Sequence, residues 1–195
     1  MIQKLLLGLV ALVAIAFLVV LGLASTKPDE FRIERSRVVT AAPATAFAIV
    51  NDFHRFAEWS PWQKLDPAMK STITGEPGAG SSLEWSGNDK AGAGRMTINE
   101  STPDSHIGMK LEFLKPFEST STTNFDFAPE GAGTKVTWTM LGKHNMMSKV
   151  MCVFMDMDKA VGKDFEEGLG NLDKLAANEP APAAADSTAA APATN

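Results

Sequence analysis

The sequence predicts an α+β domain in which a curved antiparallel sheet of about seven strands packs against a long C-terminal helix. Three observations support this prediction. Six short segments between residues 69 and 141 alternate apolar and polar side chains, residues 31–40 do the same, and residues 145–177 repeat apolar side chains at helical spacing. Residues 28–176 suit a single domain, because a stretch of roughly 150 residues is a common size for one core.

Residues 1–27 predict a transmembrane anchor. No charged or strongly polar side chain interrupts residues 5–24, and about 20 such residues in a helix match the ~30 Å hydrocarbon core of a bilayer. A secretory signal peptide is the alternative, because Gly22 and Ala24 are small residues of the kind found at cleavage sites. The apolar region of a signal peptide is normally only ~7–15 residues long, so the sequence favours an uncleaved anchor.

The charges beside the anchor favour a single-pass protein whose folded domain lies on the periplasmic or extracytoplasmic side. Lys4 and the α-amino group favour a cytoplasmic N-terminus, whereas Lys27, Arg32, Arg35 and Arg37 argue for the opposite orientation. We discount the three arginines because they belong to a predicted strand that folds away from the membrane.

The domain begins with a strand and two short helices. The strand is "FRIERSRVVT" at residues 31–40, which alternates and ends in β-branched residues. Pro43 lies near the start of a helix with Phe47 and Phe53 at helical spacing. A second short helix or turn covers "HRFAEWSPW" and ends before Pro61, which disfavours a helical conformation in the residue preceding it.

Six consecutive segments then read as the strands of an antiparallel meander. They are "KSTIT", "SSLEW", "GRMTINES", "HIGMKLEFL", "ESTSTTNFDF" and "TKVTWTML", and clusters of Gly, Pro and Asp separate them. One face of the last strands is apolar and the other carries Lys and Glu, so the sheet is half buried. The apolar face comprises Ile107, Met109, Leu111, Phe113, Val136, Trp138 and Met140.

The chain closes with an amphipathic helix and a tail. Apolar residues recur at three- and four-residue intervals from Met147 to Leu172, and this stripe must be buried against the concave face of the sheet. Gly162, Gly168 and Gly170 weaken the helix by ~1 kcal/mol each relative to Ala, which suggests a close approach to strands or to a ligand, or fraying near Gly168 and Gly170. Residues 177–195 are rich in Ala and Pro, with few large apolar residues, and predict a disordered tail.

Composition excludes several classes of function. The formal net charge is -5 and the basic residues are scattered, so no nucleic-acid partner is expected. Cys152 is the single cysteine, and the three histidines lie in different elements, so neither a disulfide, a metal site nor a bound cofactor is expected. The apolar neighbours of Cys152 predict a packed structural thiol.

The order of these elements resembles the helix-grip fold of the START-like (SRPBCC) superfamily, and within it the polyketide cyclase/dehydrase and lipid-transport group. The resemblance covers about residues 31–175 and is carried by "AAPATAFAIVNDFHRFAEWSPW", "GNDKAGAGRMTI", "LEFLKPFE", "GTKVTW" and "MDKAVGKDFEEGLGNL". It implies a deep cavity for an apolar ligand such as a lipid, sterol or polyketide. It does not imply catalysis, because fold alone does not decide function.

With that resemblance, the sequence predicts a binding or carrier domain whose hydrophobic ligand contacts inward-facing side chains. Alternation along "FESTSTTNFDF" adds hydroxyls to this wall if Phe117, Phe125 and Phe127 point inward; the hydroxyls alternatively bond to backbone or water. The predicted lining comprises Trp59, Trp62, Trp85, Met109, Leu111, Phe113, Ser119, Ser121, Thr123, Trp138, Phe154 and Val161.

Three other interpretations stay open. A cyclase- or hydrolase-like enzyme would use Glu84, Glu100 or His106 as an acid or base in the cavity, although alternation places His106 on the outer face. An interaction protein would have a cavity filled by its own side chains. The methionines between residues 146 and 157 would fill the core, or form a movable gate or a face that rests on the membrane.

Overall fold

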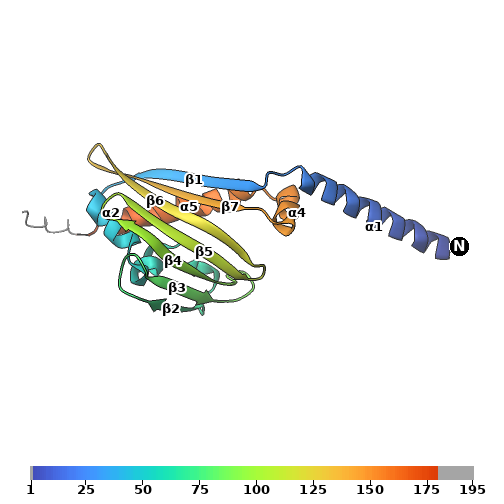
Figure 1. The fold of residues 1–195 in the computed structure, drawn as a ribbon, viewed down its shortest axis with the longest axis horizontal. Helices are drawn as coiled ribbons and strands as arrows, with labels where there is room; N and C mark the ends of the chain where they lie inside the picture. The colour runs from blue at the N-terminus through green and yellow to red at the C-terminus, as the bar shows by residue number, and fades with distance from the viewer. Residues whose placement is uncertain (1, 180–195) are drawn as a thin grey trace, which may run out of the picture.

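Seven antiparallel strands form one curved sheet in a computed structural model that describes residues 2–179. The strands are β1 (Glu30–Val39), β2 (Lys70–Thr74), β3 (Ser82–Ser86), β4 (Ala93–Thr102), β5 (His106–Lys115), β6 (Ser119–Glu130) and β7 (Gly133–Lys143). Their order across the sheet is β1-β7-β6-β5-β4-β3-β2, so β1 crosses to pair with the last strand and the others form a meander (Figure 1). The predicted fold class and strand positions are confirmed.

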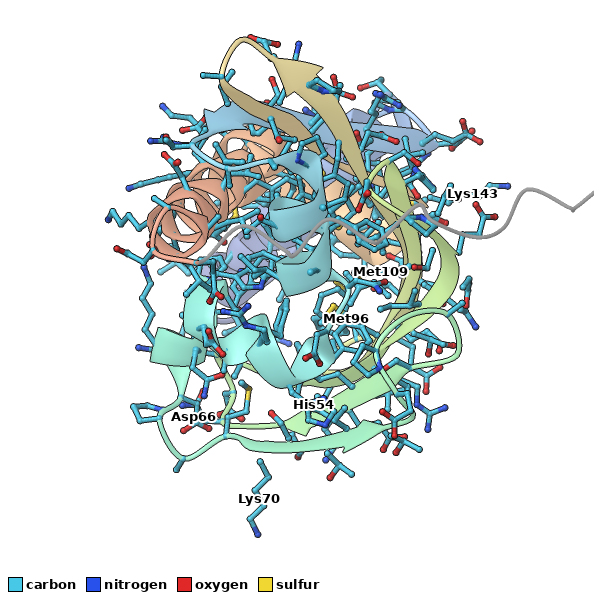
Figure 2. The ribbon with its side chains drawn as sticks, turned by 90° about the vertical axis from the view of Figure 1, so that its left-hand side faces the viewer. His54, Asp66, Lys70, Met96, Met109 and Lys143 are labelled. Carbon is cyan, nitrogen blue, oxygen red and sulfur yellow. The ribbon has the colours of Figure 1, made fainter. Side chains whose placement is uncertain are left out.

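Helices fill the concave side of the sheet and extend beyond its ends. They are α1 (Ile2–Ser25), α2 (Pro43–Val50), α3 (Phe56–Trp59), α4 (Met146–Phe154) and α5 (Met157–Ala176), with 3-10 turns η1 (Phe53–Arg55) and η2 (Gln63–Leu65). Figure 1 shows α5 lying across the sheet, α2 at one end and α4 beside the base of α1 at the other. Figure 2 shows Met96 and Met109 inside the curve of the sheet and Lys70 outside it.

The predicted C-terminal helix is interrupted near its start. Met155 adopts an extended conformation and Asp156 caps α5, accepting a hydrogen bond from the backbone N–H of Lys159 at 3.0 Å. The apolar periodicity continues through this break, which is why the sequence predicted one helix. An aspartate at an N-cap stabilises a new helix start by about 1 kcal/mol relative to alanine, and this local interaction ends the first helix. Residues 180–195 of the predicted tail lie outside the described residues.

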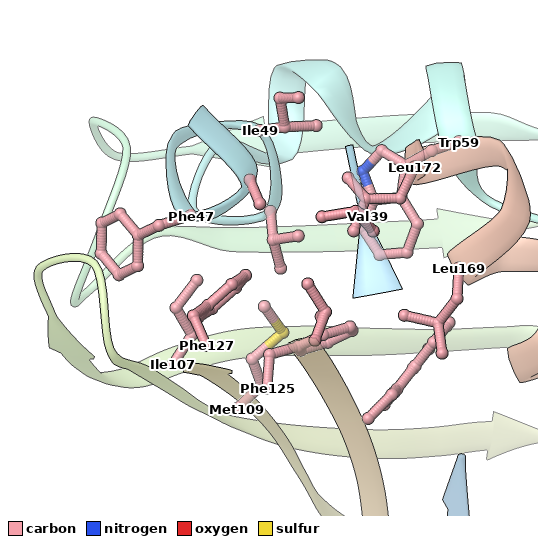
Figure 3. Packing of buried hydrophobic residues seen from close by; sticks show 14 of the residues in the cluster. Val39, Phe47, Ile49, Trp59, Ile107, Met109, Phe125, Phe127, Leu169 and Leu172 are labelled. Carbon is pink, nitrogen blue, oxygen red and sulfur yellow. The ribbon is translucent and has the colours of Figure 1, made fainter. Parts of the chain in front are cut away.

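Helices α2 and α5 and strand β6 share one buried apolar layer. Figure 3 shows Phe47 from α2 and Phe127 from β6 facing the same apolar layer as Leu172 of α5. The rings of Phe47 and Phe127 make an edge contact with centroids 5.7 Å apart, and Leu172 has no exposed surface. The Gly131 turn that joins β6 to β7 adopts φ 60°, a left-handed conformation that glycine accepts without steric cost.

An arginine on β1 holds the start of α5 against the sheet. Arg35 donates to both carboxylate oxygens of Asp158, at 3.2 and 3.0 Å, and to Glu166 at 3.0 Å. The hydrogen bonds to Asp158 are the main reason the pKa of Arg35 is raised. Gly162 packs directly on the guanidinium, where a side chain would clash, so the predicted close approach of this glycine to a strand is confirmed.

Candidate ligand-binding chamber

Side chains on the inward face of the sheet are buried along one half of the strands and part-exposed along the other half, which we call the open half. In β5, Ile107 and Met109 are buried, at 0% and 3% exposed, whereas Leu111 and Phe113 on the same face are part-exposed. In β7, Trp138 is likewise buried and Met140 part-exposed. The pairing of Phe113 with Ser119 and of Glu30 with Lys143 places the open half at the end from which α1 leaves. The chamber that we describe is this open half of the concave face.

Aromatic side chains close the chamber at mid-sheet. The ring of Trp138 stacks on Phe165 of α5 with centroids 4.0 Å apart, and it meets Trp59 at 5.6 Å and Trp62 at 5.6 Å edge to face. Trp62 also donates its indole N–H to Asp164 at 3.1 Å. Gly168 permits this packing, because a Cβ there would meet Trp138 at 2.8 Å. The tryptophans therefore join the short helices, the sheet and α5 into one cluster.

Two indole groups in this cluster are buried without a hydrogen-bond partner among the described residues. They are Nε1 of Trp59 and of Trp138, whose side chains are 1% and 3% exposed. Such a donor costs about 1–3 kcal/mol when it is unpaired. The nearly perpendicular rings, including Trp59 against Phe125 at 88°, offer aromatic faces that accept an N–H weakly.

Two hollows lie at the open end of the sheet, near the start of β1. The larger has a volume of about 590 Å³ and lies between the start of β1, the end of α4 and the start of α5. The smaller, about 380 Å³, lies along the start of β6 and the end of β7 and includes Ser121. By strand register its other residues lie mostly on the outer face of the sheet: Glu30, Thr120, Thr122, Leu141 and Lys143. Both Phe31 and Glu30 line each hollow. Volumes of this size match the ~300–1,000 Å³ of small-molecule sites.

The predicted lining residues fall into three groups. Trp59, Met109, Ser121, Thr123 and Trp138 are buried on the inner side; Trp62, Trp85, Leu111, Phe113 and Val161 are part-exposed there; Ser119 and Phe154 are exposed. The rings of Trp85 and Phe113 meet edge to face at 5.7 Å, so residues from β3 and β5 come together. Contact of any of these residues with a ligand stays a prediction.

The hydroxyl wall is shorter than the sequence suggested. Ser121 and Thr123 alternate with Phe125 and Phe127 on the buried face of β6, as predicted. Phe117, by contrast, is 52% exposed, because it precedes β6 in the turn that follows β5. The strand alternation therefore does not extend to this residue.

His144 is a chamber residue that the sequence analysis did not identify. It follows β7, lines the larger hollow, and has Cys152 Sγ of α4 at 4.0 Å from its Nε2. Burial, with a contribution from the Lys149 ammonium, lowers the pKa of His144 below its ordinary value, so the ring is neutral at pH 7. Cys152 lies eight residues further along the chain, and this spacing across a strand-to-helix turn gave no sequence signal.

The three acid–base candidates face away from the chamber. Glu84 forms an ion pair with Arg95 on the outer face of the sheet, and Glu100 is exposed. His106 contacts Asp126 through Nδ1 at 2.7 Å on the same outer face, as alternation predicted. None of the three therefore lies where it would act on a molecule in the chamber.

A family model described as "Polyketide cyclase / dehydrase and lipid transport" matches residues 30–177. The chain belongs to this family. The match begins at the first residue of β1 and ends just after α5, so it leaves α1 outside. No curated protein matches the chain.

Solved structures share the family fold at low identity. A protein from Chromobacterium violaceum is 15% identical, with a TM-score of 0.55, over 78% of this chain and 100% of that one. An uncharacterised protein from Rhizobium leguminosarum is 18% identical, with a TM-score of 0.57, over 77% and 96%. A protein of the dynemicin biosynthetic locus is 14% identical, with a TM-score of 0.53, over 76% and 47%. These likenesses show the fold.

Proposed function

We propose that this family member is a membrane-anchored START-like domain that binds or carries a hydrophobic small molecule, lipid-like or polyketide-like, in the chamber. The observation that supports it best is the set of part-exposed apolar side chains on the concave face near α1. Fully folded domains normally bury such side chains, so an apolar surface inside a concavity indicates a ligand site.

The chamber favours a ligand with an apolar body and a polar head. Leu111, Phe113 and Met140 present apolar surface from adjacent or nearby strands, while Ser121 and Thr123 lie on the same inner face in β6. Ser121 is 7% exposed and Thr123 4% exposed, so a ligand group that reached them would leave water. A hydroxyl, carbonyl or carboxylate in that position would recover hydrogen bonds, whereas a pure hydrocarbon would not.

The membrane link depends on α1. This helix has 24 residues and is long and apolar enough to cross a bilayer by length and composition. Ala24 is fully buried where α1 packs against α4. Cleavage beside this residue would remove that contact, which supports an anchor that is retained.

We place the folded domain on the extracytoplasmic side. Arg35 and Arg37 bind carboxylates of α5, so their charges are neutralised within the domain and count little toward orientation. The orientation then depends mainly on the positive charges of Lys4 and the α-amino group before α1 and of Lys27 and Arg32 after it. A reporter enzyme that is active only outside the cytoplasm, fused after residue 179, should be active; activity only of a cytoplasmic reporter at the same position would reverse the orientation.

Lipid capture by the full-length protein tests the binding proposal. The protein would be purified in a mild detergent, washed, and examined by native mass spectrometry and by titration with a fluorescent phospholipid and a fluorescent fatty acid. We expect a co-purified small molecule or saturable binding of at least one probe. Leu111→Asp should abolish the signal and Val38→Asp, on the outer face, should not. A chain that carries nothing and binds neither probe would refute the proposal.

The alternative function is a cyclase- or hydrolase-like enzyme in the same chamber. His144 is the observation that favours it, because its neutral imidazole lines the larger hollow and can accept a proton. Turnover of a polyketide-like or ester substrate that His144→Gln abolishes, while probe binding is unchanged, would support the enzyme. Equal turnover by both proteins would exclude His144 as its acid or base.

A further inference from the structure

The exposed large apolar side chains of the folded domain gather at one end. Outside α1, all of them except Val38 lie on α4, on Met155 just after it, or beside the turn between β5 and β6. The set at this end comprises Leu114, Phe117, Met146, Met147, Met151, Phe154 and Met155. We call these residues the apolar rim. Soluble domains rarely concentrate apolar side chains in this way unless the surface binds something.

The apolar rim continues the surface of α1. Helix α4 packs against the last turns of α1, and Figure 1 shows it beside the base of that helix. Leu23 near the end of α1 is 49% exposed and Phe154 of α4 is 75% exposed, so both of these packed helices present apolar side chains to the outside. The β5–β6 turn lies at the same end of the sheet, because Phe113 pairs with Ser119 there.

Helix α4 has the character of a helix that lies along a membrane surface. Its exposed face carries Met147, Met151 and Phe154, while Lys149 turns inward, is 9% exposed, and forms an ion pair with Asp29. That ion pair fixes α4 to the segment between α1 and β1. A short helix with one apolar face and fixed orientation binds the headgroup region of a bilayer by burying that face.

We infer that the apolar rim rests in the headgroup region of the bilayer that α1 crosses, so that the chamber opens onto lipid. This inference depends on the membrane anchor of the proposed function and adds a second, peripheral contact to it. The larger hollow is lined by Phe154 and Met155, which belong to the apolar rim. A hydrophobic ligand in that hollow would therefore reach the bilayer without crossing water.

The charge around the apolar rim indicates that apolar burial holds it in place. Lys27 and Arg32 stand near Glu30, Asp156 and Asp158 around the larger hollow, so the two signs are mixed. Contact that depended on attraction to anionic lipid would need an excess of basic residues and would weaken in salt. We therefore expect the contact in neutral phosphatidylcholine vesicles and expect it to persist at high salt.

Site-specific labels on the full-length protein test this inference. In a Cys152→Ser background, single cysteines at Phe154, Phe117 or Val38 would carry a polarity-sensitive fluorophore, and the protein would be reconstituted in phosphatidylcholine vesicles. We expect labels at 154 and 117 to shift to the blue and to be quenched several-fold more strongly by nitroxide-labelled lipid than the label at 38. Iodide in the water should quench the three sites in the opposite order.

An alkaline wash of the same vesicles separates the inference from the proposed function. A chain released by the wash has no membrane anchor, and the proposed function fails on that point. A chain that stays in the vesicles while the labels at 154 and 117 behave like the label at 38 has an anchor but no rim contact, and the inference is overturned. Crosslinking of the 154 site to a second copy, without lipid quenching, would also overturn it.

Discussion

Replacing the Thr123 hydroxyl with a methyl group isolates the polar part of the chamber. Valine has nearly the same shape as threonine and is equally suited to a strand, so Thr123→Val changes chemistry without changing backbone preference. Thr123 lies on the inner face of β6 and is 4% exposed. If its hydroxyl binds the ligand head, the substitution weakens ligand binding and leaves the folded domain intact.

The expected loss follows from the value of one buried hydrogen bond. A neutral hydrogen bond contributes about 1 kcal/mol net, which corresponds to roughly a fivefold rise in Kd. Stability should change by less than about 0.5 kcal/mol, because the buried hydroxyl is exchanged for an apolar group of the same size. Thr123→Val should therefore raise Kd and leave the free energy of unfolding nearly unchanged.

Thr134 supplies the matched control. Its hydroxyl is fully buried and donates to the carbonyl of Ala41 at 2.7 Å, a contact inside the protein. Thr134→Val should lower the free energy of unfolding by about 1–2 kcal/mol, because it leaves that carbonyl without this donor. The same substitution should leave Kd unchanged.

Fluorescent-lipid titration gives Kd and urea unfolding followed by circular dichroism gives stability for each variant. The reasoning predicts a change in Kd alone for Thr123→Val and a change in stability alone for Thr134→Val. A Thr123→Val protein with unchanged Kd and reduced stability would refute it, because the hydroxyl would then bond to backbone or internal water.

Three further substitutions, two of them paired with a control substitution, test contacts around the chamber. Gly168→Ala should lower the melting temperature despite the ~1 kcal/mol gain in helix propensity, because its Cβ would lie 2.8 Å from the ring of Trp138. Gly170→Ala, whose Cβ would have its nearest neighbour at 3.9 Å, should raise it. Arg35→Met should cost about 1–3 kcal/mol, or a Tm lower by a few degrees, and Arg32→Met, whose side chain is mostly exposed, should cost under about 0.5 kcal/mol; equal losses would contradict the assigned role. His144→Gln should flatten the pH dependence of stability. Because folding lowers the pKa of His144, the unfolded chain binds the proton first, and wild-type stability should fall as pH falls through about 6.5, while a wild-type curve that is flat from about pH 7.5 to 5.5 would contradict the assignment.

The strands of this fold were predictable because each is specified locally. Alternation along β5 and β7 identified the inward residues, and the turn clusters gave the strand boundaries to within two residues, except that β6 runs three residues past its predicted end at Phe127. The break between α4 and α5 was not predictable in the same way. The N-cap formed by Asp156 competes locally with continuation of the first helix. Apolar residues keep helical spacing through Met155, so the sequence pattern showed no break there.

The sequence predicted which face of the sheet forms the site but not how deeply each residue is buried. Alternation gives the side of the sheet on which Met109 and Leu111 lie, but it does not distinguish how deeply each is buried. Only the placement of α5 and the tryptophan cluster makes Met109 buried and Leu111 part-exposed. His144 and Cys152 were missed for a related reason. Their proximity depends on how α4 folds back from the end of β7, which no spacing in the sequence specifies.

The short connection between α1 and β1 limits how far the domain can lie from the end of α1. Residues 26–29 separate the two elements, and four residues span at most about 14 Å when fully extended. The first inner side chain of β1, Phe31, lines the larger hollow together with Lys27 and Pro28, so this hollow lies within a short distance of the point where α1 ends. If α1 crosses the bilayer, the domain has too little chain to turn its open end away or to travel between membranes. A carrier on such a tether would exchange its ligand with the bilayer that holds it, or pass it to a partner that comes to that surface.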